Sequence, residues 1–144
     1  MPTRLLLLLV ALGLPRTVLA DLDLVPPESG PLYYVLALTP FAAWLLVATV
    51  RESRRPFADF LVLGILYGLS LAVAHQVLWN AAAGYGQSPP ADAVEFAERF
   101  GAGWHEFAFR AYTSGIAMSI GLGTGLVAAL VAVGARAWRS HRAH

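Results

Sequence analysis

The chain has no cysteine and no lysine, and each absence excludes a kind of chemistry. Without thiols there is no disulfide, no thiolate metal site and no cysteine nucleophile. Without a lysine amine there is no Schiff base. The net charge is only +1, so no basic field indicates a nucleic-acid partner.

Apolar residues, in contrast, are abundant: 58% of the 144 residues are hydrophobic and only 13% are charged. A soluble domain of this size buries too little of its surface to hide so many apolar side chains. Apolar runs that cross a lipid bilayer account for the excess. We therefore expect an all-α fold, a polytopic membrane helical bundle that forms a single membrane domain over residues 1–144.

Three segments, residues 32–50, 57–83 and 104–136, are apolar and long enough to serve as transmembrane helices. Between the last two, residues 89–100 carry apolar side chains on one face of a helix and charged side chains on the rest. This pattern predicts a short amphipathic helix outside the membrane, lying on its surface. Residues 137–144 form a basic cytoplasmic tail.

Residues 1–20 allow two interpretations. A basic start, a leucine-rich run and small residues before Asp21 are typical of a secretory signal peptide. The same segment can also be a first transmembrane helix, interrupted by Pro15 and Arg16. The bundle therefore has four transmembrane helices, or three if residues 1–20 are cleaved.

The charges predict an orientation, because cytoplasmic ends of membrane helices are rich in basic residues. Most of the arginines flank one set of segment ends, and carboxylates flank the other. The arginines of the first set are Arg4, Arg51, Arg54, Arg55, Arg136, Arg139 and Arg142, and the acids of the other set are Asp21, Asp23, Glu28, Asp92, Glu95 and Glu98. We expect a multi-pass protein of the bacterial cytoplasmic (inner) membrane with a cytoplasmic C-terminus. Its arginine-rich ends are expected to bind anionic lipids.

Small residues recur at four-residue steps on two of the segments. Helices in lipid associate through such residues, because they let two backbones approach closely. We expect segments 57–83 and 104–136 to pack on one another, with self-association or docking on a partner as an alternative use. The helix-packing residues are Gly64, Gly68, Gly115, Ser119, Gly121 and Gly125.

Polar side chains inside membrane segments are costly and therefore functional candidates. Those of this chain lie toward the outer ends of their segments, and none near the midplane is a carboxylate, which disfavours a proton- or sodium-coupled transporter. The residues are His75, Gln76, Asn80, His105, Glu106, Arg110, Thr113 and Ser114. Their first interpretation is structural: the side chains of His75, Gln76 and Asn80 form hydrogen bonds across two helices. The expected partners are Arg110, Thr113 or Ser114.

Two kinds of ligand site remain as alternatives. His75, His105 and Glu106 supply imidazole and carboxylate ligands for a metal, and the two histidines are the candidate axial ligands of a haem. A rise of about 1.5 Å per residue separates the expected depths of the two histidines by roughly 10–15 Å, which disfavours a haem. Their spacing is not a recognised metal-ligand pattern, which disfavours a metal. A pocket for a quinone or a lipid headgroup near His75, Trp79 and Arg110 is the other alternative.

The favoured function is that of a non-enzymatic accessory or assembly subunit of a larger membrane complex, with no cofactor. Catalysis is disfavoured because Ser114 and His105 are about 13 Å apart along one helix axis. A ligand-binding or electron-transfer protein with a haem, metal or quinone site is the first alternative, and a transporter or channel subunit is the second. The expected partners are the lipid bilayer and other membrane subunits or a second copy.

Overall fold

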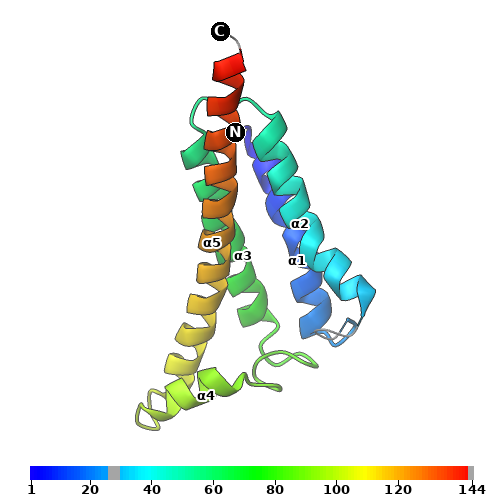
Figure 1. Cartoon of the computed structure of the whole chain (residues 1–144). Helices are drawn as coiled ribbons and strands as arrows, with labels where there is room; N and C mark the ends of the chain where they lie inside the picture. The colour runs from blue at the N-terminus through cyan, green and yellow to red at the C-terminus, as the bar shows by residue number, and fades with distance from the viewer. Residues whose placement is uncertain (26–29, 143–144) are drawn as a thin grey trace.

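The computed structural model describes residues 1–25 and 30–142, and these residues form helices joined by turns (Figure 1). The helices are α1 (Thr3–Asp21), α2 (Pro31–Val50), α3 (Pro56–Val77), α4 (Ala91–Glu98) and α5 (His105–Arg142). The predicted acid Glu28 and the last two residues of the predicted tail, 143–144, lie outside the described residues. Within those residues, the expected all-α class is confirmed.

Four of these helices, α1, α2, α3 and α5, are long and apolar enough to cross a membrane. In Figure 1 they form two pairs, α1 with α2 and α3 with α5. The α3–α5 contact is the most extensive, α1 also packs on α3, and α2 also packs on α5. The short helix α4 lies crosswise at the end of α5 that is remote from the C-terminus (Figure 1).

The helix α1 contacts α2 through the side chain of Trp44 and contacts α3 at Gly13, where a side chain is absent. Trp44 is 2% exposed, and its indole N–H donates to the carbonyl of Leu9 at 3.1 Å. It packs edge-on against Tyr67, with 5.2 Å between the ring centroids. The ring of Tyr67 occupies the space that a side chain on Gly13 would need. Gly13 therefore lets α1 lie close to α3.

The contact between α3 and α5 is backbone on backbone. Gly64 and Gly68 of α3 face Gly121 and Gly125 of α5, and a methyl group on Gly64 or Gly121 would overlap the opposing backbone. Among the other predicted packing residues, Gly115 has open space where a side chain would stand, and Ser119 is exposed. These two residues lie on the outward side of α5.

The third predicted segment, residues 57–83, is shorter in the structure, because α3 ends at Val77. The alanines at 81–83 favour a continued helix, but the chain turns back on itself here. The N–H of Ala81 donates to the carbonyl of Leu78, and that of Gly86 to the carbonyl of Trp79 at 2.7 Å. Gly84 also contacts the carbonyl of Leu78 so closely that a side chain would not fit.

Two further boundaries differ from the prediction. The amphipathic helix covers Ala91–Glu98 rather than residues 89–100, and it turns Ala93 and Ala97 into the contact with α5. The helix α5 continues to Arg142, so the described part of the predicted tail is helical. No proline or glycine interrupts residues 135–142, which explains why the helix continues.

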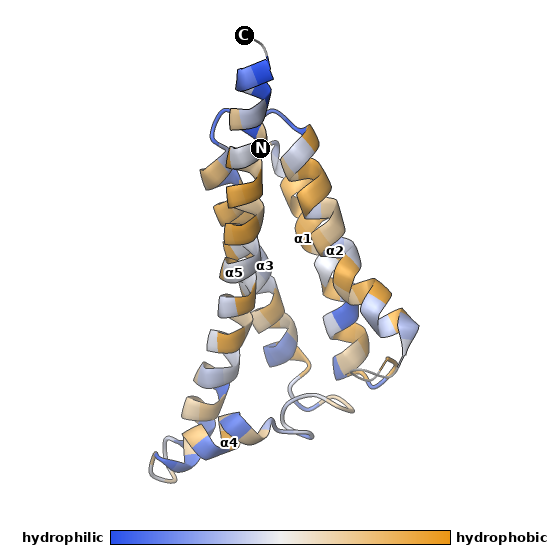
Figure 2. Ribbon diagram, viewed as in Figure 1, coloured by the Kyte–Doolittle hydropathy of each residue, from blue (hydrophilic) through white to orange (hydrophobic). Residues whose placement is uncertain are grey.

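Most of the arginines gather at one end of the bundle, and Asp21, Asp92, Glu95 and Glu98 lie at the opposite end. Arg136 donates to the carbonyl of Arg54 at 3.0 Å, and Arg139 donates to the carbonyl of Thr49, so the end of α5 lies beside the 51–55 turn. The amino group of Met1 joins this end, 2.7 Å from the carboxylate of Asp59. Figure 2 shows hydrophilic residues gathered here and again around α4. We call the first of these the arginine-rich end.

Candidate functional site

The polar side chains gather at the end opposite the arginine-rich end, where α1 and α3 finish and α5 begins. They form two networks, one on each side of α3. The α3–α5 network contains Gln76, Glu106, Arg110 and Ser114. The Asp21 network contains Asp21, His75 and Tyr85.

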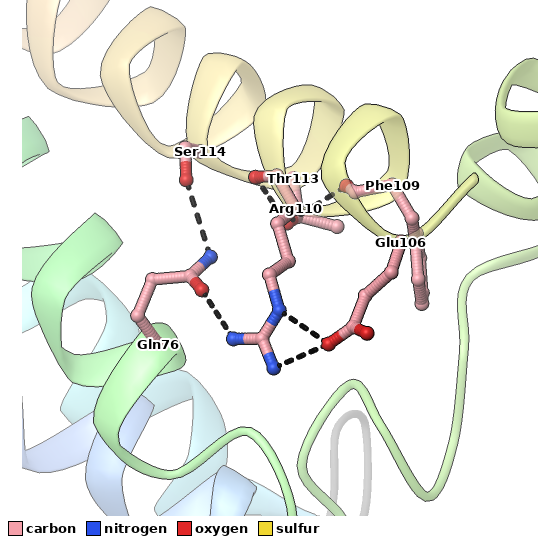
Figure 3. A network of polar contacts seen from close by, with 6 residues as sticks. All are labelled: Gln76, Glu106, Phe109, Arg110, Thr113 and Ser114. Carbon is pink, nitrogen blue, oxygen red and sulfur yellow. Dashed lines mark hydrogen bonds and ion pairs between the residues drawn. The ribbon is translucent and has the colours of Figure 1, made fainter. Parts of the chain in front are cut away.

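In the α3–α5 network, Gln76 joins the two helices through both atoms of its amide (Figure 3). Its Oε1 accepts from Arg110 Nη1 at 2.8 Å, and its Nε2 donates to Ser114 Oγ at 3.3 Å. Arg110 also donates to Glu106, one helical turn earlier, through Nε at 3.0 Å and Nη2 at 2.9 Å. The amide of Gln76 thus forms a hydrogen bond with the guanidinium of Arg110 and another with the hydroxyl of Ser114.

Trp79 completes this side of the site. The guanidinium carbon of Arg110 lies 4.3 Å from the centroid of the Trp79 ring, a cation–π contact. The ring also packs edge-on against Phe109, with centroids 4.9 Å apart. Thr113 is buried but donates to the carbonyls of Phe109 and Arg110 on its own helix (Figure 3). It therefore does not join α5 to α3.

In the Asp21 network, the last residue of α1 meets the last turn of α3. Asp21 is 5% exposed, and its Oδ2 lies 2.7 Å from Nδ1 of His75. The ring of Tyr85 stacks on the imidazole at 4.4 Å between centroids, with its hydroxyl 3.4 Å from Nε2. The N–H of Ala83 donates to the carbonyl of Asp21 at 3.1 Å. The segment that follows α3, residues 78–86, is thus hydrogen-bonded to the end of α1.

The surroundings of Tyr85 disfavour its ionised form. Burial raises the pKa of the Tyr85 hydroxyl above its ordinary value of 10.0, and the negative charge of Asp21 raises it further. The positive charge of Arg16 acts in the opposite direction but does not reverse the shift. Arg16 itself donates to the hydroxyl of Tyr33 at 3.2 Å.

The ligand set considered from the sequence is not brought together. His75 contacts Asp21 and Tyr85, whereas Glu106 lies in the α3–α5 network. In residues 1–25 and 30–142, no group of three or more histidine, aspartate or glutamate side chains is placed to hold a metal. His105 begins α5, and Asn80 is exposed beyond the end of α3. Trp79 and Arg110, by contrast, lie in contact.

Sequence reasoning missed Asp21 as the partner of His75. The sequence analysis placed Asp21 only among the outer acids, directly after the candidate signal peptide. The one available signal was its position directly after an apolar stretch of helical length, at the predicted depth of the outer polar residues.

A second candidate surface lies on α5, away from α3. Its outward side carries a row of small residues at four-residue steps, which we call the outer α5 face: Ala111, Gly115, Ser119 and Gly123. At Gly123 the face continues into an apolar groove of about 150 Å³ between α5 and α2. Phe41, Trp44 and Val127 line this groove.

Comparison of the chain with protein-family models, curated proteins and solved structures found no match.

Proposed function

We propose that this protein is a multi-pass membrane protein that acts as a non-enzymatic accessory or assembly subunit. It binds a transmembrane helix of another membrane protein through the outer α5 face. The observation that carries the proposal is that α5 has two rows of small residues, and α3 covers only one of them.

The row of small residues that contacts α3 indicates how the outer α5 face can bind a helix. Because lipid tails are as apolar as the helices, close backbone contact must supply much of the attraction between helices. Gly121 and Gly125 make that contact with α3. Gly115 and Gly123 also lack side chains, and they lie on the outward side of α5. No atom lies within 4 Å of the position that a side chain on either residue would take.

The neighbouring groove favours an apolar helix as the occupant. Its lining holds aromatic and aliphatic side chains, one threonine and no charged residue. A large apolar side chain of a partner helix, placed one turn from the close contact, can enter it. A partner with charged contact residues would leave them without counter-charges on this surface.

The polar networks support a structural role rather than a catalytic one. Ser114 accepts from Gln76 and forms no pair with a histidine among the described hydrogen bonds, so the nucleophile and base that hydrolysis needs are not adjacent. Arg110 is engaged by Glu106, Gln76 and Trp79. The hydrogen bond between Arg110 and Gln76 joins α5 to α3.

The contacts of α1 favour its retention in the mature protein. Removal of residues 1–20 would take away the Leu9 carbonyl that binds Trp44 and the Gly13 surface under Tyr67. We therefore propose four transmembrane helices, with the arginine-rich end in the cytoplasm of a bacterial cell, as the charge distribution favours. The intact mass of the purified protein tests retention of α1, and impermeant labelling of Ser53→Cys in intact cells tests the orientation.

A photo-crosslinking amino acid placed on α5 tests the docking proposal directly. Gly115 is the test position, and Val73, 61% exposed on α3, is the control. The two lie at similar depth because Gln76, one turn from Val73, contacts Ser114. We expect a crosslink to one membrane protein from position 115 and none to that protein from position 73.

The variant Gly115→Leu then separates specific docking from chance capture. We expect it to fold normally and to lose the crosslinked protein on co-purification in mild detergent. Retention of that protein by Gly115→Leu would contradict the proposal. So would a crosslink only to a second copy of this chain, or a monodisperse protein without a partner.

A further inference from the structure

Two grooves meet at the arginine-rich end, and they differ in chemistry. The polar groove has a volume of about 550 Å³ and lies between the 51–55 turn and α5, with Arg54, Arg136 and Arg139 on its walls. The apolar groove, about 710 Å³, lies between the first turn of α3 and α5. Arg136 and Ser140 line both grooves, so the two lie next to each other along α5.

The polar groove carries an excess of positive charge. Arg136 and Arg139 donate to the carbonyls of Arg54 and Thr49, which are uncharged acceptors. Among the ion pairs of the described residues, none involves Arg54, Arg136 or Arg139. Glu52 is the single acid on the wall. Three guanidinium groups thus face one carboxylate, which suits a bound anion.

The apolar groove extends this site along the helices. Phe57 and Ala58 of α3 form one wall, and Val133 and Ala137 of α5 form the other. Phe57 is 44% exposed and Val133 is 42% exposed, so both present apolar surface without a protein partner. An apolar chain attached to an anion in the polar groove would lie along this surface.

We propose that the two grooves together bind one anionic diacyl phospholipid. Its phosphate accepts hydrogen bonds from Arg54, Arg136 and Arg139, because guanidinium groups match phosphate oxygens in charge and geometry. One acyl chain lies between Phe57 and Val133. Both grooves fall within the roughly 300–1,000 Å³ that is common for sites of small ligands. A free phosphate ion would leave the apolar groove unused.

The lipid site requires that the bundle lies in a bilayer, but it does not require the partner protein proposed above. The site lies at the arginine-rich end, whereas the outer α5 face begins near the opposite end. Failure to capture a partner protein would therefore not contradict the lipid site. Failure to bind lipid would not contradict the docking proposal.

Native mass spectrometry of the whole protein, released from detergent micelles, measures lipid retention. The probes are dioleoyl phosphatidylglycerol, which is anionic, and dioleoyl phosphatidylcholine, which has the same chains and no net charge. We expect one phosphatidylglycerol to be retained in preference to phosphatidylcholine. A soluble glycerophosphate, added in excess, should not displace it.

Two charge variants test the polar groove. Arg136→Gln and Arg54→Gln each remove one guanidinium, and each should weaken phosphatidylglycerol binding about fivefold, the usual effect of one basic residue at a lipid surface. Arg54→Gln leaves the backbone carbonyl that Arg136 contacts in place, so it tests the site even if Arg136→Gln misfolds. The control is Arg99→Gln, which removes the same charge from α4 at the opposite end.

The variant Ala137→Trp tests the apolar groove, because it fills the groove without changing charge. Leu130→Trp, two turns away on the same side of α5 and 59% exposed before substitution, is its control. We expect only Ala137→Trp to lower phosphatidylglycerol retention. Equal losses in Arg99→Gln and Arg136→Gln, no loss in Ala137→Trp, or no preference over phosphatidylcholine would each overturn the proposal.

Discussion

The helix α3 contacts its two main neighbours in different ways. Toward α5 it presents Gly64 and Gly68, and the two backbones meet without side chains between them. Toward α1 it presents Tyr67 and His75, which contact Gly13 and the carboxylate of Asp21. One interface depends on the absence of side chains, and the other on an aromatic ring and a partly buried polar pair.

This difference predicts different sensitivities. Backbone contact is lost when any atom is added, whereas a polar pair tolerates a change of size but not the loss of a hydrogen-bonding group. Lipid cannot replace either contact, because it offers neither a matching surface nor hydrogen-bond donors. The variants below test the two interfaces in order of the expected loss.

The largest loss is expected for Gly121→Leu. A side chain here meets the backbone of Gly64 and Gly68, which cannot move aside without separating α3 from α5. Overpacking costs about 1–3 kcal/mol when neighbours can adjust, and we expect about 3 kcal/mol or more where they are backbone. Reversible unfolding of the detergent-solubilised protein in a denaturing detergent measures the loss.

The matched control for this variant is Gly115→Leu on the outward side of the same helix. The added side chain meets open space, and leucine favours a helix by up to about 1 kcal/mol relative to glycine. The expected result is unchanged or slightly raised stability. Similar losses in both variants would show that the two rows of small residues are equivalent.

The second-largest loss is expected for Asp21→Ala. The substitution leaves Nδ1 of His75, a partly buried side chain, without its partner, which costs about 1–3 kcal/mol. Asp21→Asn, which can still accept a hydrogen bond, should lose less. The same unfolding measurement applies to both variants.

Asp92→Ala is the control, since it removes an exposed carboxylate from the same end of the molecule. If it destabilised the protein as much as Asp21→Ala, net charge rather than the His75 contact would account for the effect.

Sequence reasoning identified the small residues of α3 and α5, but it could not tell which row on α5 faces α3. Gly115 and Gly121 occur in equally regular rows, and spacing alone does not tell which row faces α3. The choice depends on the rotation of α5 about its axis. That rotation is fixed by residues spread along the helix, such as Ala117 and Ala132, which are buried on the α3 side.

The same reasoning found Gln76 and Arg110 but not Asp21. Gln76 and Arg110 lie at similar depth on neighbouring apolar segments, so depth counting brings them together. Asp21 and His75 are 54 positions apart with a whole helix, α2, between them, and their contact depends on α1 packing against α3. The end of α3 at Val77 was missed because Ala81–Ala83 favour a helix until Gly84 closes a turn.

A smaller effect is expected for the hydrogen bond between Gln76 and Arg110, which adds a polar contact to the α3–α5 interface. A double-mutant cycle with Gln76→Ala and Arg110→Ala should give a coupling energy of about 0.6 kcal/mol, as is usual for such bonds between membrane helices. The control cycle pairs Gln76→Ala with Thr113→Ala, because Thr113 bonds to its own helix. Equal coupling in the two cycles would contradict the assigned network.

The smallest effect at neutral pH is expected for Tyr85→Phe. The hydroxyl of Tyr85 lies 3.4 Å from His75 Nε2, a long hydrogen bond, so its loss should cost less than about 0.5 kcal/mol. The ring keeps its stacking on the imidazole in this variant. The interface between α1 and α3 therefore stays closed at neutral pH.

At alkaline pH the stability of the wild type should depend more strongly on pH than that of Tyr85→Phe. Burial and the charge of Asp21 raise the pKa of Tyr85 in the folded protein above 10.0, so the unfolded chain loses this proton first. The contribution of Tyr85 to stability is complete below pH 10.0 and decreases as the pH rises above that value. Unfolding free energies from about pH 8 to 11 should fall more steeply for the wild type than for Tyr85→Phe. Parallel profiles would mean that the Tyr85 hydroxyl is open to water in the folded protein, and they would contradict its burial beside Asp21.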